Sequence, residues 1–165
     1  MNHIVEVKMG CLEIITNDST ELKTFVGSCV AICLFDTVSK IAGMAHVMLP
    51  KKIGSKQFTE KKEMGKYADE AMAYMLNDMI RRGADPTRIC AKMAGGATIF
   101  AHESENSVFN VGTRNIEHLK QILKNNHIPL LSEDTGENFG RWVRFNLRSG
   151  EMIIVSNLRK LEKTI

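Results

Sequence analysis

The sequence predicts a layered α+β fold, in which central, mostly antiparallel β-sheets are flanked by helices. Apolar residues recur with a period near two at the start, middle and end of the chain, and with a period near 3.6 in two windows. The strand-like segments at both ends of the chain are joined by short links, which permit antiparallel but not parallel pairing. The 165 residues contain no linker, repeat or low-complexity segment, so we expect one domain over residues 1–165.

Eight segments have the apolar pattern and flanking residues of β-strands. They are residues 4–7, 11–15, 30–35, 41–49, 89–93, 128–131, 142–147 and 152–155. The dipeptide Ser149-Gly150 separates the last two segments and predicts a hairpin turn, because glycine accepts the backbone angles that such turns require.

Two segments have the spacing of amphipathic helices. The first begins near Ala68 and ends before Gly83 and Pro86, with one apolar stripe made of Ala71, Met72, Met75, Leu76, Met79 and Ile80. The second carries Ile116, Leu119, Ile122 and Leu123. We interpret the methionines of the first stripe as core packing, because methionine at this spacing usually fills the interior.

The charge of the chain limits the classes of partner that the sequence predicts. Lys plus Arg exceed Asp plus Glu by 22 − 19 = 3, a bias too weak to predict a nucleic-acid partner. Residues 51–66 hold six lysines and two glutamates but lack interleaved aromatic residues, so we interpret them as a solvated loop, with an acidic partner as the alternative.

The four cysteines form no Cys-x2-Cys pair, and the start of the chain lacks the apolar stretch of a secretion signal. We therefore expect reduced thiols and a cytoplasmic location. The longest uncharged run, residues 24–35, has 12 residues against the roughly 20 that cross a bilayer, so we expect no membrane insertion.

Cys29 and His46 are the candidate chemical pair. If residues 30–35 and 41–49 form a hairpin in which Phe35 pairs with Lys40, Cys29 lies opposite His46; if Phe35 pairs with Ile41, Cys29 lies opposite Val47. Directly opposed side chains have Cβ atoms roughly 4.5–5.5 Å apart. A histidine at that distance can take the thiol proton and stabilise a thiolate that attacks a carbonyl carbon.

Gly27 and Ser28 precede the cysteine and allow a sharp turn, which would direct backbone N–H groups at a developing oxyanion. The alternative is a buried core cysteine without chemistry. A zinc site made by Cys29, Cys33 and His46 is a second alternative, but a Cys-x3-Cys spacing inside a strand lacks the usual knuckle turn. We therefore expect no metal and no cofactor.

These residues also resemble a known family. The string Gly-Ser-Cys-Val-Ala at residues 27–31 with Asp36, and Gly-Met-Ala-His-Val-Met-Leu-Pro at residues 43–50, are similar to the two central motifs of the chemoreceptor glutamine deamidases called CheD. Further similarities lie at residues 67–69, 91–92, 95–97, 110–115, 134–136 and 140–141. One departure is clear: the family usually has two consecutive glycines after Asp134-Thr135, whereas here Gly136 is followed by Glu137.

The resemblance implies a fold shared with cysteine-dependent toxin deamidases, with Cys29 as nucleophile, His46 as catalytic histidine and Thr24 as the third catalytic residue. It implies hydrolysis of glutamine side chains to glutamate and ammonia on the cytoplasmic helices of methyl-accepting chemotaxis receptors. Hydrolysis of receptor methyl esters is an extension of the same chemistry. The phosphatase CheC is the second implied partner, and a CheC-binding regulatory module with weak or no deamidase activity is the alternative function.

Overall fold

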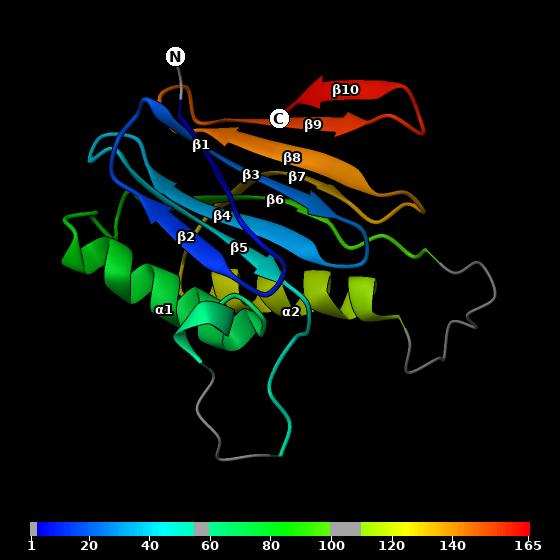
Figure 1. Ribbon diagram of the computed structural model, residues 1–165. Coiled ribbons are helices and arrows are strands. Elements are labelled where there is room, and N and C mark those ends of the chain that lie inside the picture. The colour runs from blue at the N-terminus through cyan, green and yellow to red at the C-terminus, as the bar shows by residue number, and fades with distance from the viewer. Residues whose placement is uncertain (1–2, 55–59, 100–109) are drawn as a thin grey trace.

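The computed structural model describes residues 3–54, 60–99 and 110–165 and arranges them in three layers (Figure 1). One five-stranded sheet has the order β1-β3-β8-β9-β10, and the other has the order β2-β5-β4-β6-β7. Both helices lie on the far side of the second sheet (Figure 1). We call the helix-covered sheet the central sheet and the other the outer sheet. The predicted mixed α+β architecture with mostly antiparallel sheets is confirmed.

The central sheet contains the uncharged part of the sequence. Its strands are β2 (Leu12–Ile15), β4 (Val30–Asp36), β5 (Ile41–Val47), β6 (Cys90–Gly95) and β7 (Leu130–Thr135). Every residue of β4 and β5 is buried. A strand that is covered on both faces has a nearly continuous apolar sequence, which explains why the sequences of β4 and β5 do not alternate between polar and apolar residues.

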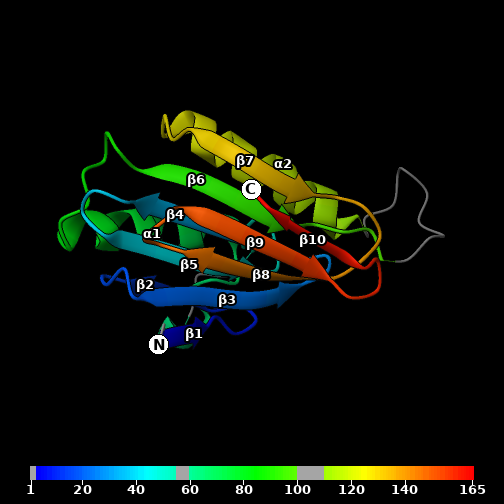
Figure 2. The same ribbon diagram turned by 90° about the horizontal axis from the view of Figure 1, so that it is seen from above.

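The outer sheet is covered on one face only. Its strands are β1 (His3–Glu6), β3 (Thr20–Val26), β8 (Arg141–Asn146), β9 (Glu151–Ser156) and β10 (Leu161–Thr164). Buried and more exposed residues alternate along β8 and β9, as expected for strands with one solvated face. Seen from above, β8 and β9 overlie β4 and β5 (Figure 2). The predicted hairpin turn joins β8 to β9, and Gly150 has a φ of 70° there.

Two apolar cores separate the three layers. Beneath the central sheet, the helices α1 (Ala68–Arg81) and α2 (Val111–Asn125) bury one core, in which Met72, Met75 and Met79 are at most 2% exposed. The packing interpretation of these methionines is confirmed. Between the sheets, the rings of Phe35 and Phe145 lie with centroids 4.9 Å apart. Among the described residues, no helix combines the length and the apolar character needed to span a membrane.

Two sequence-based expectations about the strands need correction. The strands β3 and β10 were not predicted, and residues 21–26 do not alternate strictly between polar and apolar. The expected antiparallel pairing holds for β8 with β9 but is wrong at the start of the chain. There β1 pairs in parallel with β3, and β2 pairs with β5, because the link through Gly10, with a φ of 72°, passes from the outer to the central sheet.

Candidate functional site

Four strand ends meet at one end of the central sheet. Val30, the first residue of β4, pairs with Val47 at the end of β5 and with Gly95 at the end of β6. Gly95 in turn pairs with Thr135, the last residue of β7. We call this the site end of the sheet, because Cys29 directly precedes Val30 and His46 directly precedes Val47.

The register of the β4–β5 hairpin differs from both predicted alternatives. Asp36 pairs with Ile41, so His46 lies opposite Ala31, and the predicted opposition of Cys29 to His46 is wrong. The turn has four residues, 37–40, and lies one position later in the chain than in the first alternative, because the Asp36 carboxylate accepts the N–H groups of Val38 and Ser39. Relative to that alternative, the residue opposite His46 moves by two positions, from Cys29 to Ala31, so Cys29 and His46 still belong to the same face of the hairpin. Cys29 and Ala31 accordingly contribute to the same core between the sheets.

His46 is held by Thr24, which projects from the opposite sheet. The Thr24 hydroxyl donates a hydrogen bond to the carbonyl oxygen of Val7, with the oxygens 2.7 Å apart, and lies 2.8 Å from Nδ1 of His46. Since the single hydroxyl proton is used on Val7, the hydroxyl accepts from Nδ1–H. The neutral ring is therefore the tautomer with its lone pair on Nε2.

The backbone of His46 is fixed by the link between β1 and β2. Its N–H donates to the carbonyl oxygen of Cys11 at 2.9 Å, and its own carbonyl accepts from the N–H of Gly10 at 3.2 Å. His46 is 3% exposed. Burial lowers the pKa of His46 below the ordinary value of 6.5, because the charged ring would lose hydration. A neutral imidazole, ready to accept a proton on Nε2, is the resting state at neutral pH.

Cys29 lies in the bend that precedes β4 and is partly exposed. Burial raises the pKa of Cys29 above the ordinary value of 9.0, an effect that its own backbone N–H partly offsets. The resting state of Cys29 is therefore a thiol. Two contacts fix the bend: the carbonyl of Cys29 accepts from Gly96 N–H at 2.8 Å, and that of Gly27 accepts from Ala97 N–H at 2.9 Å.

The structure brings Thr24 and His46 into contact and leaves Cys29 outside that contact. Within the described residues, the buried Nε2 of His46 has no hydrogen-bond partner, so it is not bonded to the Cys29 sulfur. Catalytic hydrogen bonds often become shorter only when substrate is bound. The described part of the chain contains no group of three His, Cys, Asp or Glu side chains that could hold a metal ion.

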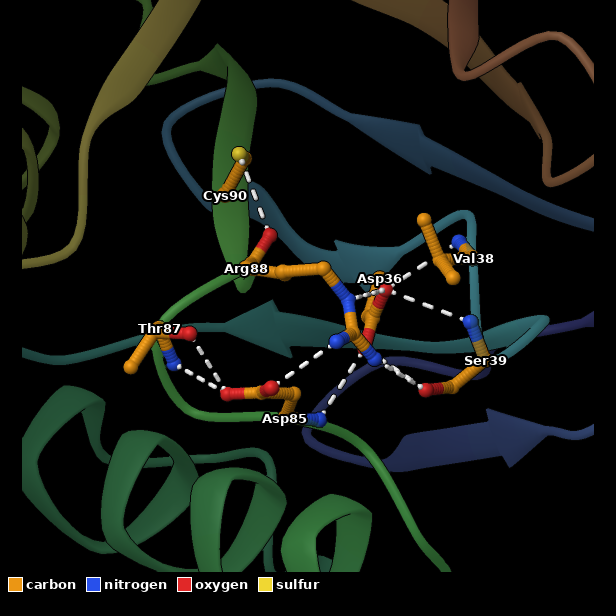
Figure 3. Close-up of polar contacts among 7 residues, drawn as sticks. All are labelled: Asp36, Val38, Ser39, Asp85, Thr87, Arg88 and Cys90. Carbon is orange, nitrogen blue, oxygen red and sulfur yellow. Dashed lines mark hydrogen bonds and ion pairs between the residues drawn. The ribbon is translucent and has the colours of Figure 1, made fainter.

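A second polar cluster lies at the other end of β4 (Figure 3). The buried Asp36 carboxylate accepts both Arg88 guanidinium contacts, at 3.0 and 3.2 Å, and the N–H of Asp85 at 3.0 Å. Burial alone would raise the pKa of Asp36, yet the hydrogen bonds from Arg88, Asp85 and Ser39 lower it well below its ordinary value. Both carboxylate oxygens of Asp36 are fully used as hydrogen-bond acceptors, so they are not available to a ligand. The cluster connects the hairpin turn to the segment before β6.

The lysine-rich segment 51–66 is only partly described, since residues 55–59 lie outside the described residues. Lys62 is exposed and pairs with the equally exposed Glu60, with Nζ and Oε2 2.8 Å apart. An exposed ion pair of this kind contributes little to stability.

Sequence reasoning missed the residues that support the site. Strand β3 was among the supporting elements that were missed, so Thr24 was expected from the family resemblance alone. Glu137, which stands where the family usually has glycine, has a φ of 61° and follows Gly136 with a φ of 79°. The loop thus keeps a glycine-like backbone although the side chain differs.

Comparison with known proteins gives the relatives of this chain. A family model described as CheD chemotactic sensory transduction matches residues 48–156. The chain is 42% identical over 147 residues to the "Chemoreceptor glutamine deamidase CheD" of Halalkalibacterium halodurans, covering 88% of this chain and 89% of the relative. It is 39% identical over 148 residues to the protein of the same name from Thermotoga maritima, covering 90% and 88%.

Among solved structures, the Bacillus licheniformis hypothetical protein YfiH superimposes with a TM-score of 0.49 at 15% sequence identity, over 83% of this chain and 60% of that chain. The Neisseria meningitidis protein NMB0706 does so with a TM-score of 0.45 at 10% identity, over 82% and 64%. This chain thus spans less than two thirds of either protein.

Proposed function

The chain belongs to the CheD family, and we propose that it hydrolyses glutamine side chains on chemoreceptors to glutamate and ammonia during chemotaxis. The names of the relatives support the substrate and reaction. The observation that carries the chemistry is the contact of Thr24 with Nδ1 of His46, which leaves Nε2 as an unpartnered base at the same end of the sheet as Cys29. We assign Cys29 as nucleophile, His46 as proton carrier and Thr24 as its positioning partner.

In the first half-reaction, the Cys29 sulfur bonds to the amide carbon of the substrate as its proton passes to Nε2 of His46. The carbonyl electron pair moves onto oxygen, where the backbone N–H groups of Ser28 and Cys29 are the nearest candidates to stabilise the charge. Collapse of this intermediate breaks the carbon–nitrogen bond. The proton on Nε2 passes to the leaving nitrogen, so ammonia departs and a thioester remains.

In the second half-reaction, water replaces ammonia. Nε2 of His46 takes a proton from the water as its oxygen attacks the thioester carbon, and the same proton returns to the sulfur as the carbon–sulfur bond breaks. The sum is glutamine plus water giving glutamate plus ammonia. Burial favours the neutral states of both groups, so the charge separation is confined to the moment of attack.

Three finer expectations belong to this proposal. The substrate segment would be a cytoplasmic helix of the receptor, and the chain would act in the cytoplasm, where its four free cysteines stay reduced. The thioester route would also cleave a glutamate methyl ester, because methanol leaves from the same intermediate more readily than ammonia. Binding of the phosphatase CheC follows from the family resemblance.

The direct test is incubation of the purified chain with a chemoreceptor cytoplasmic fragment, followed by mass spectrometry of the receptor peptides. We expect a unit mass increase at specific glutamines with the wild-type chain and none with Cys29→Ala. The control is Cys33→Ala, which removes a fully buried thiol opposite Met44 and leaves the site end intact. Receptor or CheC binding without any mass change would replace the proposal with the regulatory-module alternative.

A further inference from the structure

Arg141, the first residue of β8, is a fully buried arginine. It forms an ion pair with the carboxylate of Asp134, and it donates to the carbonyl oxygens of Asp134 at 2.7 Å and Gly136 at 2.6 Å. Its guanidinium carbon lies 4.6 Å from the ring centroid of Phe139. Removing a guanidinium from water costs several kcal/mol unless its donors are used. Arg141 uses its two terminal nitrogens to close the turn between β7 and β8, whereas its buried Nε has no hydrogen-bond partner among the described residues.

This turn holds the segment that follows β6. The N–H of Gly136 donates to the carbonyl of Gly95 at 2.9 Å, and the carbonyl of Glu137 accepts from Thr98 N–H at 2.8 Å. Both turn residues have positive φ, a conformation that is unfavourable for Glu137 because its Cβ crowds the backbone. Such a conformation persists only where the surroundings hold it. The guanidinium on the carbonyl of Gly136 supplies one of the contacts that hold it.

The segment after β6 in turn holds the cysteine bend through the bonds from Gly96 to Cys29 and from Ala97 to Gly27. A trans peptide group is planar, with its N–H pointing away from its C=O. Since the carbonyl of Gly27 faces Ala97, the N–H of Ser28 faces the opposite side. The orientation of this candidate oxyanion donor is thus set by a contact from another strand.

We propose that Arg141 is a positioning residue for the cysteine bend. It contacts the β7–β8 turn, this turn contacts residues 95–98, and residues 95–98 contact the bend. This inference rests on the proposed function, because the proposed function makes Cys29 in this bend the nucleophile. The hydrogen-bond partners of Arg141 among the described residues are Asp134, Gly136 and Phe139, not Cys29 or His46, so it acts by fixing backbone groups. Arginine is required because its planar fork reaches several oxygens at once, which the single ammonium of lysine does not.

The chain contains a matched control. The Asp36–Arg88 pair is also an ion pair with a buried aspartate, but it lies at the opposite end of β4 and holds a different turn (Figure 3). Arg88→Lys and Arg141→Lys make the same chemical change. Only the second one removes contacts that lead to Cys29.

The experiment compares these two variants of the full chain. For Arg141→Lys we expect kcat on the receptor fragment to fall roughly ten- to hundredfold with KM nearly unchanged, the usual effect of a small misplacement of reacting groups. Amide hydrogen exchange at Gly96 and Ala97 should become faster by a similar factor. For Arg88→Lys we expect a lower Tm with kcat and the exchange at both amides unchanged. Equal kcat for the two variants, once corrected for the folded fraction, would overturn the proposal.

A second pair of variants covers the case in which Arg141→Lys does not fold. Glu137 is exposed, so substitutions there leave the core intact. Glu137→Gly keeps the positive φ, whereas Glu137→Pro forbids it. We expect only the proline variant to have a lower kcat and faster amide hydrogen exchange at Gly96 and Ala97. Unchanged exchange at these two amides in the proline variant would refute the proposed chain of contacts. Exchange needs no activity, so a wild-type chain without deamidation would overturn the proposed function separately.

Discussion

The two ring nitrogens of His46 have different surroundings. Nδ1 is bonded to a threonine whose own proton is committed to a backbone carbonyl, and Nε2 has no partner among the described residues. A carboxylate in the place of Thr24 would stabilise the imidazolium ion. A hydroxyl orients the ring and fixes its tautomer without adding charge. His46 is thereby a neutral ring with a defined tautomer, whose lone pair is on Nε2.

Substitutions at Thr24 test this orientation. Thr24→Val keeps the shape but removes the acceptor of Nδ1–H, and we expect kcat to fall roughly ten- to hundredfold because the ring is no longer held. Thr24→Ser restores the hydroxyl and should keep most of the activity. Deamidation rates measured by mass spectrometry, with circular dichroism to verify folding, give the comparison. Equal activity of the serine and valine variants would exclude Thr24 from the mechanism.

The pH profile tests the protonation states of the resting site. Activity requires neutral His46 and protonated Cys29, because the thiol proton must pass to Nε2. Burial lowers the pKa of His46 below 6.5, so the basic form persists to lower pH, and burial raises the pKa of Cys29 above 9.0, so the thiol persists to higher pH. We expect kcat/KM to rise below pH 6.5, to stay level, and to fall above pH 9.0.

The matching control for this profile is His46→Gln, in which the acid limb should disappear along with most of the activity. A rate that instead keeps rising through pH 8 to 9 would mean that a thiolate must form before substrate attack. Cys29 alkylation by iodoacetamide followed against pH gives the thiol titration independently.

At the scale of elements, the hairpin register shows what a sequence can and cannot specify. One of the two predicted hairpin registers already placed Cys29 and His46 on the same face, whereas the other did not. The exact partner depends on the position of the turn, which is fixed by hydrogen bonds from Val38 and Ser39 to Asp36. The order of polar and apolar residues alone does not show at which residue a strand ends and such a turn begins.

The Asp36 cluster gives an expectation for stability against pH. The lowered pKa of Asp36 means that its contribution is fully present above the ordinary aspartate value of 3.8 and is lost as the pH falls toward the lower folded value. We expect Asp36→Asn to cost about 2 kcal/mol of unfolding free energy at pH 7. The difference from wild type should shrink at pH 3.

Urea denaturation at pH 7 and pH 3 provides the measurement for this cluster. The exposed Glu117 on α2 is the matched site, since Glu117→Gln removes a carboxylate that has no such network and should change stability little at either pH. A pH-independent deficit in Asp36→Asn would show that the cluster acts through packing and not through charge.

At the scale of the whole molecule, the three layers depend on the core between the sheets. Phe145 of the outer sheet is fully buried, with its ring centroid 4.9 Å from that of Phe35 in the central sheet. We expect Phe145→Ala to cost about 3–5 kcal/mol, because a large cavity would open between the sheets. Phe25→Ala, on the outer sheet with its side chain 49% exposed, should cost far less. Urea midpoints would separate the two, and similar losses would contradict the layered packing.

The sequence was most informative where one chemical pattern determined one element. Both helices followed from periodicity, the fully buried strands from their nearly continuous apolar runs, and the candidate cysteine and histidine from their motifs. Sequence reasoning failed where structure depends on distant partners. The strand β3 does not alternate strictly between polar and apolar residues, and it pairs with β1 on one side and β8 on the other, so neither its existence nor the contact of Thr24 was visible in local sequence.

The position of β3 between early and late segments also determines when the site is completed during synthesis. Thr24 pairs in register with Val143, so its strand gains this flanking neighbour only after β8 has left the ribosome. The hairpin that carries His46, and the bend with Cys29 before it, contact segments made much earlier. Pairings between distant segments close later than local ones, because a long loop must be ordered first. The nascent chain therefore contains the candidate cysteine and histidine before β8 joins the strand that carries the Thr24 hydroxyl.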